Sequence, residues 1–207
     1  MKRLIFLLLT VSFLVACGSE QKHASVAPGA TVLVLGDSVS YGTGAGKDED
    51  YPTILAANTG WDVINAGVPG DTSAAGLERL PELLEEHSPK LLLVELGGND
   101  FLQHVPLTQT ASNLKAILAQ ARAKGIPSVL LAVPRPNLLG AAVGKLSDDP
   151  LYERIASETD TPIVKNVLSE VLSKSALKAD PIHPNAEGYH KLEEGLRRSL
   201  LELGFFK

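Results

Sequence analysis

The sequence predicts a single α/β domain built around a mostly parallel, five-stranded sheet. After residue 30, five short strand-like runs alternate with helix-like segments, which is the pattern of a parallel sheet. The runs are largely apolar rather than alternating, so we expect helices to cover both faces of the sheet. A hydrophobic content of 44% provides enough apolar surface to stabilise such a core against chain entropy.

The strand-like runs occur at intervals along the whole predicted domain. They are Thr31–Leu35, Trp61–Asn65, Leu91–Leu96, Ser128–Val133 and Pro162–Lys165. Helical spans fall between them, and no internal repeat or low-complexity linker interrupts residues 30–207. We therefore expect one domain over residues 30–207.

Three helices can be placed by their apolar periodicity or their end signals. Residues 111–124 gather apolar side chains on one face and end at Gly125, a residue that favours helix termination. A short helix is expected over Leu168–Lys174. The last helix has one apolar stripe, which is interpreted as core packing, and four charged residues that we expect to face solvent. The stripe is Tyr189, Leu192, Leu196, Leu200 and Leu203, and the charged residues are Glu193, Glu194, Arg197 and Arg198.

The segment from Pro134 to Pro150 fits neither a helix nor a strand. Long ordered loops in compact domains are often functional. Its middle, which includes Leu138 and Leu139, is too apolar for a solvated loop. Two interpretations remain open, an acyl pocket beside the active site or packing onto the core.

The N-terminal residues have the composition of an export signal. Lys2 and Arg3 precede an apolar run that is shorter than the ~20 residues needed to span a bilayer. The run ends in Leu-Val-Ala-Cys, which resembles a bacterial lipobox, so we expect a signal peptide over residues 1–16 and lipidation of Cys17. The alternative is a plain signal peptide with an incidental cysteine. Residues 17–29 then form the lipidated cysteine and a short polar tether.

Composition excludes several classes of protein. A formal net charge of -5 and an aromatic content of 5% argue against nucleic-acid binding. Cys17 is the only cysteine, so the domain has no disulfide, no thiol nucleophile and no cysteine-based metal site. The histidines are scattered without metal-ligand spacing, so we expect no metal and no cofactor.

Four polar segments follow predicted strands or precede the last helix. They are Gly36-Asp37-Ser38, Ala66-Gly67, Gly97-Gly98-Asn99-Asp100 and Asp180-Pro181-Ile182-His183. Because the carboxyl ends of parallel strands share one edge of a sheet, the first three should converge there, and the fourth can reach the same edge.

Together these segments contain the parts of a serine hydrolase. Ser38 supplies a hydroxyl nucleophile, and His183 can accept its proton near neutral pH. Asp180 lies three residues before His183 and can orient the imidazole. The Ser38 and Gly67 backbone N–H groups and the Asn99 amide are suitable donors for an oxyanion hole.

Each of these residues also has a structural interpretation. Ser38 lacks the Gly-x-Ser-x-Gly elbow and, in isolation, reads as a turn serine. Asn99 and Asp180 can serve as caps or turn residues, and Gly67 as a turn glycine. The presence of all four segments in one chain favours the catalytic interpretation.

Three further aspartates read as structural residues. We expect Asp37 to hydrogen-bond the turn backbone and Asp71 to cap the next helix at its N-terminus. Asp100 is likewise expected to be structural.

The four motifs and their order resemble the SGNH branch of the GDSL esterase/lipase superfamily. The matching blocks are Gly36-Asp-Ser-Val-Ser-Tyr-Gly42, Val63-Ile-Asn-Ala-Gly-Val-Pro-Gly-Asp-Thr72, Glu95-Leu-Gly-Gly-Asn-Asp100 and Asp180-Pro-Ile-His-Pro-Asn185. The closest likeness is to small bacterial periplasmic arylesterases, acyl-thioesterases and lysophospholipases. One departure is Val39, which stands where the family name has leucine.

The resemblance implies a three-layer, flavodoxin-like fold with a triad of Ser38, Asp180 and His183. It also implies an oxyanion hole formed by Ser38, Gly67 and Asn99. The expected function is hydrolysis of carboxylic esters of acyl substrates through an acyl-enzyme intermediate, with thioesters as a second substrate class. The alternatives are a carbohydrate O-acetylesterase of the cell envelope and a non-catalytic lipoprotein that binds envelope components.

The expected setting is the bacterial cell envelope. If Cys17 is lipidated, Ser19 rather than Asp shortly after it implies outer-membrane sorting, with the domain facing the periplasm. We expect a monomer that contacts the membrane only through its lipid anchor.

Overall fold

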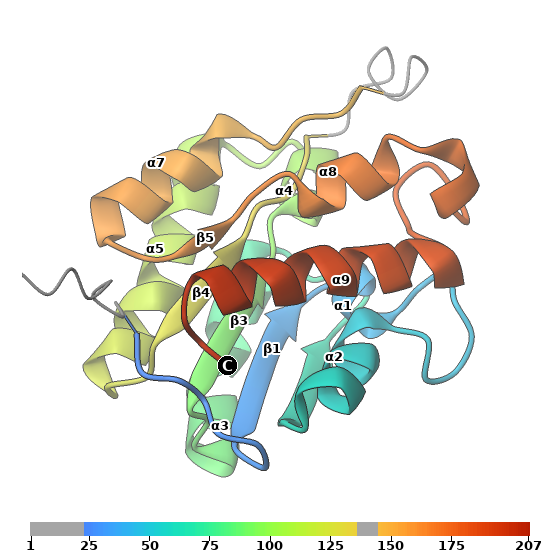
Figure 1. Cartoon of the computed structure of the whole chain (residues 1–207). Coiled ribbons are helices and arrows are strands. Elements are labelled where there is room, and N and C mark those ends of the chain that lie inside the picture. The colour runs from blue at the N-terminus through green and yellow to red at the C-terminus, as the bar shows by residue number, and fades with distance from the viewer. Residues whose placement is uncertain (1–22, 136–144) are drawn as a thin grey trace, which may run out of the picture.

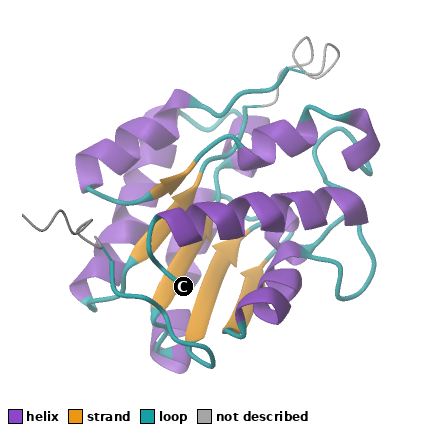
Figure 2. Ribbon diagram, viewed as in Figure 1, coloured by secondary structure: helices purple, strands orange, loops and turns teal. Residues whose placement is uncertain are grey.

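The computed structural model describes residues 23–135 and 145–207, which form three α/β/α layers (Figure 1, Figure 2). Five parallel strands run in the order β2-β1-β3-β4-β5. They are β1 (Thr31–Gly36), β2 (Asp62–Gly67), β3 (Leu91–Glu95), β4 (Ser128–Leu131) and β5 (Ile163–Val164). The predicted fold class and all five predicted strands are confirmed, with strand ends shifted by only one or two residues.

Helices cover both faces of this sheet. In Figure 1, α2, α8 and α9 lie on the near face, α3 and α5 lie behind the sheet, and α7 packs beside α5. The helices are α1 (Ser38–Tyr41), α2 (Tyr51–Thr59), α3 (Ser73–His87), α4 (Gly98–Leu102), α5 (Leu107–Ala123), α7 (Pro150–Thr159), α8 (Val167–Leu172) and α9 (Ala186–Glu202). A 3-10 turn, η1 (Ser175–Leu177), follows α8.

The central strands are the most deeply buried part of the fold. Every residue of β3 is buried, and so is every residue of β1 after Thr31. The edge strand β2 contains only exposed and half-buried residues, because it has a neighbouring strand on one side only. The core therefore lies around β1 and β3, whose carboxyl ends carry the predicted site.

The last helix differs from its prediction at one charged residue. Its apolar stripe is buried as expected, with Leu203 half-buried. Glu193, however, is only 2% exposed and accepts a hydrogen bond of 2.9 Å from Arg197 Nε. The prediction that Glu193 faces solvent is wrong because α9 contacts α2, α8 and β5, so its buried surface is wider than one stripe.

Two helix starts also differ from the sequence predictions. Helix α5 begins at Leu107, four residues before the predicted start, directly after Pro106. Helix α3 is capped by Thr72, whose Oγ1 accepts the N–H of Ala75, and not by Asp71. The side chain of Asp71 instead forms an ion pair with Arg79, with a distance of 2.7 Å to Arg79 Nε.

The described part of the predicted tether packs against the domain. The His23 ring stacks on Phe205 at 4.7 Å, and the Val26 N–H donates to the Phe205 carbonyl at 2.6 Å. Trp61 Nε1 donates to the Val26 carbonyl at 3.1 Å. Residues 23–29 therefore lie on the domain surface rather than extending from it.

Several predictions concern residues outside the described ranges. These are the signal peptide over residues 1–16, lipidation of Cys17, and the pocket residues Leu138 and Leu139. Among the residues that the structure describes, every helix falls short of the length and apolarity needed to cross a membrane.

Candidate active site

The ends of the three strands β2, β1 and β3 meet at one edge of the sheet. Gly36 at the end of β1 pairs in register with Gly67 of β2 on one side and with Glu95 of β3 on the other. The chain then turns directly into α1, which begins at Ser38. Parallel pairing thus places three of the predicted polar segments side by side, as expected from the sequence.

The turn that carries Ser38 is held by its neighbour Asp37. The Asp37 carboxylate caps α1 and accepts the Val39 N–H at 3.0 Å, while its own side chain is only 3% exposed. This is the structural role predicted for Asp37. This cap uses the N–H of Val39 and not that of Ser38, which stands at the first position of the helix.

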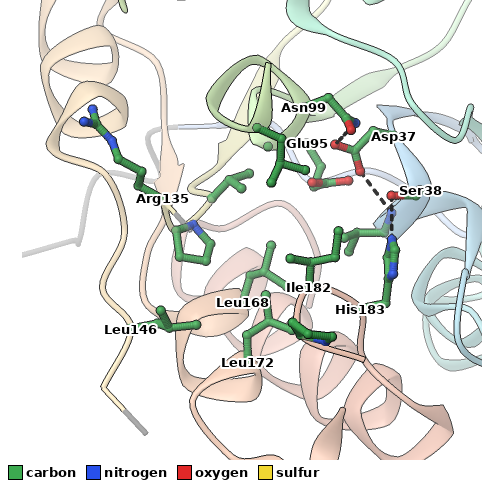
Figure 3. A pocket seen from close by; sticks show the side chains of 16 residues that line it. Asp37, Ser38, Glu95, Asn99, Arg135, Leu146, Leu168, Leu172, Ile182 and His183 are labelled. Carbon is green, nitrogen blue, oxygen red and sulfur yellow. Dashed lines mark hydrogen bonds between the residues drawn. The ribbon is translucent and has the colours of Figure 1, made fainter. Parts of the chain in front are cut away.

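His183 links Ser38 to Asp180. The distance from Ser38 Oγ to His183 Nε2 is 2.9 Å, and that from His183 Nδ1 to Asp180 Oδ2 is 2.6 Å. Asp180 Oδ1 also accepts the backbone N–H groups of Ile182 and His183, each at 2.9 Å. The three side chains therefore form one continuous hydrogen-bonded chain across the strand edge (Figure 3 shows Ser38 and His183).

The Asp180 carboxylate is suited to remain ionised. Partial burial raises its pKa, but the hydrogen bonds from the His183 ring and from two backbone N–H groups outweigh burial. The net pKa shift of Asp180 is therefore downward. An ionised Asp180 favours the imidazole tautomer that carries its proton on Nδ1, which leaves Nε2 free to accept the Ser38 proton.

Two of the predicted oxyanion donors already have acceptors within the protein. The Gly67 N–H donates to Asn65 Oδ1 at 2.9 Å. Asn99 Nδ2 donates to Asp37 Oδ2 at 3.1 Å and to the Asp71 carbonyl at 2.9 Å. Both groups lie near Ser38, and their use by an oxyanion requires that these hydrogen bonds be shared or exchanged.

Gly67 is a glycine for a reason that the sequence did not suggest. A Cβ at this position would lie 2.3 Å from the Tyr41 backbone nitrogen and 2.7 Å from the Ser40 carbonyl carbon. The missing side chain thus lets β2 pack against α1.

A mostly apolar cavity of about 210 Å³ opens beside Ser38 and His183. Figure 3 shows its walls, which include Leu146, Leu168 and Leu172 on the side away from the Ser38 hydroxyl. Asn99, Asp37 and Glu95 line the end nearest to Ser38. The cavity therefore has a polar end at the hydroxyl and an apolar end under α8.

Comparison with known proteins places this geometry in a family. The sequence model of the GDSL-like lipase/acylhydrolase family matches residues 34–191, which is most of the chain. This chain belongs to that family. The resemblance inferred from the four motifs is therefore confirmed.

Individual GDSL-like acylhydrolases are similar over most of their length. The chain is 34% identical over 178 residues to thioesterase 1/protease 1/lysophospholipase L1 of Escherichia coli K12, covering 84% of each protein. It is 35% identical over 179 residues to esterase TesA of Pseudomonas aeruginosa, covering 84% of this chain and 89% of that protein. A crystal structure of TesA superposes with a TM-score of 0.74 at 34% identity, over 84% of this chain and 99% of that one.

These likenesses establish the class of reaction. The chain is a carboxylic ester hydrolase of the GDSL/SGNH type, as predicted from the sequence. Its fold is that of the SGNH-hydrolase esterases. Among residues 23–135 and 145–207, no group of three or more His, Cys, Asp or Glu side chains is arranged to hold a metal ion.

Sequence reasoning missed several residues of this candidate site. Leu146, Leu168 and Leu172 were assigned to no site, although they line the cavity. Glu95 was quoted only as part of a motif, yet its buried side chain also lines the cavity. A single carboxylate that ends the apolar run Leu91–Glu95 was the available signal, because buried charges rarely occur without a specific partner.

Proposed function

We propose that this esterase cleaves acyl esters in two steps, with Ser38 as the nucleophile and an acyl-enzyme as the intermediate. His183 takes the Ser38 proton and passes it to the leaving group, then activates water for deacylation. Asp180 orients the ring and stabilises the imidazolium. The observation that carries this proposal is the continuous chain Ser38–His183–Asp180, with distances of 2.9 and 2.6 Å.

The oxyanion of each tetrahedral intermediate would be bound by three donors. The Ser38 N–H stands at the start of α1, where the helix dipole also favours negative charge. Gly67 and Asn99 would contribute if the oxyanion replaces their present acceptors. An alkoxide is a stronger acceptor than the Asp71 carbonyl or the Asn65 amide, so the exchange is favoured when the charge develops.

The apolar cavity supports an acyl group as the part of the substrate that is recognised. Its leucine walls, two of them from α8, lie at the end away from the Ser38 hydroxyl, where the acyl chain of an ester would extend from the reacting carbonyl. Because the Escherichia coli relative is named both a thioesterase and a lysophospholipase, thioesters and lysophospholipids should be tested beside simple esters. Neither the proposed triad nor its oxyanion donors require a cofactor.

The proposed location is the bacterial cell envelope. In this proposal residues 1–16 are removed, Cys17 is lipidated, and the hydrolase domain over residues 30–207 works as a monomer at the outer membrane, on the periplasmic side. Mass spectrometry of the full chain after expression in a bacterium tests this proposal. An acylated N-terminal Cys17 is expected, and its loss in Cys17→Ser is the control; a mature chain with unmodified Cys17 would refute the anchor.

The role of Ser38 is tested with the full chain, purified in detergent and assayed with nitrophenyl esters of increasing acyl length. Ser38→Ala should lower kcat by about 10⁴-fold or more, because the nucleophile is lost. It should also abolish labelling by a fluorophosphonate. Ser175→Ala, which alters an exposed serine of η1, is the matched control and should retain both properties.

Two results would count against the proposal. Wild-type turnover by Ser38→Ala would exclude the nucleophile, and an unlabelled, inactive wild-type chain would favour a non-catalytic envelope-binding protein. Acetylated glycans belong in the same substrate panel, since the O-acetylesterase alternative predicts that they outperform the longer acyl esters.

A further inference from the structure

Glu95 is a buried acid at the active site that the proposed mechanism does not use. It is the last residue of β3, it is 1% exposed, and it lines the same cavity as Ser38 and His183. Its backbone pairs in register with Gly36, directly before the turn that carries Ser38. A charged side chain in this position needs a physical explanation.

Hydrogen bonding satisfies only one oxygen of the Glu95 carboxyl group. Ser40 Oγ donates to Glu95 Oε2 at 2.8 Å and lies 2.8 Å from the Tyr51 hydroxyl, which can donate to Ser40 in turn. Glu95 Oε1 is buried, and no donor within the described part of the chain is bonded to it. An ionised Glu95 would therefore bury an unpaired, partly charged oxygen.

The neighbouring carboxyl group belongs to Asp37. Both side chains line the cavity beside Ser38 (Figure 3), and Glu95 is among the hydrogen-bonding partners that affect the Asp37 carboxyl group. Asp37 accepts the Val39 N–H at 3.0 Å and Asn99 Nδ2 at 3.1 Å, so two N–H donors stabilise its ionised form. One proton placed on Glu95 Oε1 and donated to Asp37 would satisfy the orphan oxygen and remove the repulsion between two buried charges.

Burial and the surrounding groups favour one retained proton. Burial is the largest influence on the pKa of both carboxyl groups and raises both; the charge of Asp37 raises that of Glu95 further. The hydrogen bond from the Ser40 hydroxyl and the nearby backbone N–H groups of Asp37 and Ser40 lower the pKa of Glu95 by less. The pair therefore holds one proton more tightly than ordinary carboxyl groups do.

The other titratable and charged groups around the pair come from several elements. Tyr51 of α2, Tyr152 of α7 and Tyr189 of α9 lie within the electrostatic range of both carboxyl groups, and Asp71 and His183 lie within that of Asp37. Arg79 of α3 donates to the Gly36 carbonyl at 2.9 Å, but its Nε is paired with Asp71. These cations are thus engaged with other groups: Arg79 with Asp71 and a backbone oxygen, and His183, when protonated, with Asp180.

We propose that Glu95 is a positioning residue that stays protonated at neutral pH and donates its proton to Asp37. Asp37, held in this way, fixes both the Ser38 turn and the amide of Asn99. Glu95 transfers no proton to the substrate and acts only through Asp37. This inference deepens the proposed function and rests on Ser38 and Asn99 having the roles given above.

The decisive comparison is Glu95→Gln with Glu95→Leu in the full chain. Glutamine can accept from Ser40 and donate to Asp37, as a neutral acid does, so its kcat should stay within about threefold of wild type. Leucine removes the donor to Asp37 and should lower kcat by roughly 10- to 100-fold with a smaller change in KM, which is the range for loss of one buried hydrogen bond. Circular dichroism establishes that each variant is folded.

An infrared measurement tests the proton without relying on activity. At neutral pH the difference spectrum of wild type minus Glu95→Gln should contain the C=O stretch of a protonated carboxylic acid. Ser38→Ala should retain this band while losing turnover, so failure of the nucleophile assignment and failure of the Glu95 assignment give different results.

Two outcomes would overturn the inference. Absence of the band shows that Glu95 is ionised. Equal loss of kcat in folded Glu95→Gln and Glu95→Leu shows that a negative charge at Glu95 is needed instead. If Glu95→Leu does not fold, the infrared band and the turnover of Glu95→Gln decide the question by themselves.

Discussion

At the scale of single residues, close packing at the site is as specific as its chemistry. Gly67 illustrates this, because the volume of a methyl group at this position is already occupied by the backbone of α1. Both ends of the Asn65 amide are also hydrogen-bonded to the backbone near the site. Its Nδ2 donates to the Ser40 carbonyl at 2.7 Å, and its Oδ1 accepts the Gly67 N–H at 2.9 Å. The turn at Ser38 is therefore supported from β2 as well as from Asp37.

Substitution of Gly67 by alanine should harm both stability and activity. The new Cβ would meet the Tyr41 backbone nitrogen at 2.3 Å, so α1 must move, and such overpacking typically costs about 1–3 kcal/mol. We expect a lower unfolding midpoint and a lower kcat, measured by thermal denaturation and ester hydrolysis. Gly46→Ala is the control, since its Cβ meets only the flexible side chain of Glu49. Equal midpoints for the two variants would contradict the packing role of Gly67.

Asp180 leads to a separate prediction at this scale. Asp180→Asn should lower kcat by about 10²- to 10⁴-fold, because the amide can present its N–H to Nδ1 and favour the wrong imidazole tautomer. Fluorophosphonate labelling should slow in parallel. Asp160→Asn, at an αL position remote from the site, is the control. Near wild-type kcat in Asp180→Asn would exclude Asp180 as the orienting group.

At the scale of secondary-structure elements, a buried aspartate joins the helices that flank the site. Asp100 of α4 is fully buried and accepts the Ser73 N–H at 2.7 Å, at the start of α3. It also accepts the Ser73 hydroxyl and, at 3.1 Å, the Thr110 hydroxyl of α5. One carboxylate thus satisfies donors from two helices and places Asn99, its neighbour in α4, relative to them.

Removal of this carboxylate should destabilise the whole domain. Asp100→Ala leaves the Ser73 N–H and two hydroxyl groups without their acceptor, which should cost about 2–4 kcal/mol of unfolding free energy. Urea denaturation measures this cost. Glu82→Ala, at an exposed position of α3, should change the unfolding free energy by less than about 0.5 kcal/mol. A cost for Asp100→Ala as small as that of the control would refute the linking role.

The elements that sequence reasoning predicted are those whose signal is local. Continuous apolar runs predicted β1 and β3 because both strands are buried on both faces. The burial of Glu193 could not be predicted, since it depends on which elements pack around α9. The role of Glu95 could not be predicted for the same reason. Its partners Ser40 and Asp37 lie far away along the chain and contact it only because β1 pairs with β3.

In the candidate site too, some features could be predicted from local motifs, while others depend on how distant segments pack. Motif spacing predicted which side chains meet at the strand edge, and the distances between Ser38, His183 and Asp180 agree with that prediction. The present acceptors of Gly67 and Asn99 were not predictable, because they belong to Asn65, Asp37 and the backbone of Asp71. Such contacts follow from the packing of turns, for which the sequence contains no periodic signal.

At the scale of the whole molecule, the acid pair should influence stability across the pH range. Because the folded-state pKa values of Asp37 and Glu95 are raised, their contribution to stability is fully present below the ordinary carboxyl pKa of about 4. It is lost as the pH rises through the folded-state values. Asp180 has the opposite sign: its pKa is lowered, so its contribution is lost as the pH falls.

The loss of stability with rising pH that the raised pKa of Glu95 implies can be tested with Glu95→Gln. The variant has no ionisable carboxyl group at position 95. Its unfolding midpoint should therefore rise relative to that of wild type as the pH increases from about 4 to 9. Differential scanning calorimetry at several pH values measures the difference. Glu82→Gln, an exposed substitution on α3, should run parallel to wild type over the same range. A constant difference between Glu95→Gln and wild type would contradict the raised pKa of Glu95.

The cavity makes a prediction about substrate length. Leu146 is half-buried at the apolar end, so Leu146→Trp should fill part of the 210 Å³ without disturbing the core. We expect kcat/KM for long-chain nitrophenyl esters to fall by about tenfold or more, which corresponds to a few lost methylene contacts, while acetyl ester hydrolysis is retained. Leu201→Trp, on the exposed face of α9, is the control. An unchanged length profile would place the acyl chain elsewhere.

The docking of residues 23–29 determines from which side the enzyme can be attached to something else. His23 lies beside residues 125–128 and 160–162, where β4 and β5 begin, whereas Ser38 follows the opposite end of the six-residue strand β1 (Figure 1). At about 3.3 Å per residue, the two edges are about 20 Å apart. A fusion partner or an immobilising support joined ahead of His23 would therefore lie at the edge of the sheet where β4 and β5 begin. The opposite edge, which carries Ser38 and the cavity, would remain accessible to bulky substrates.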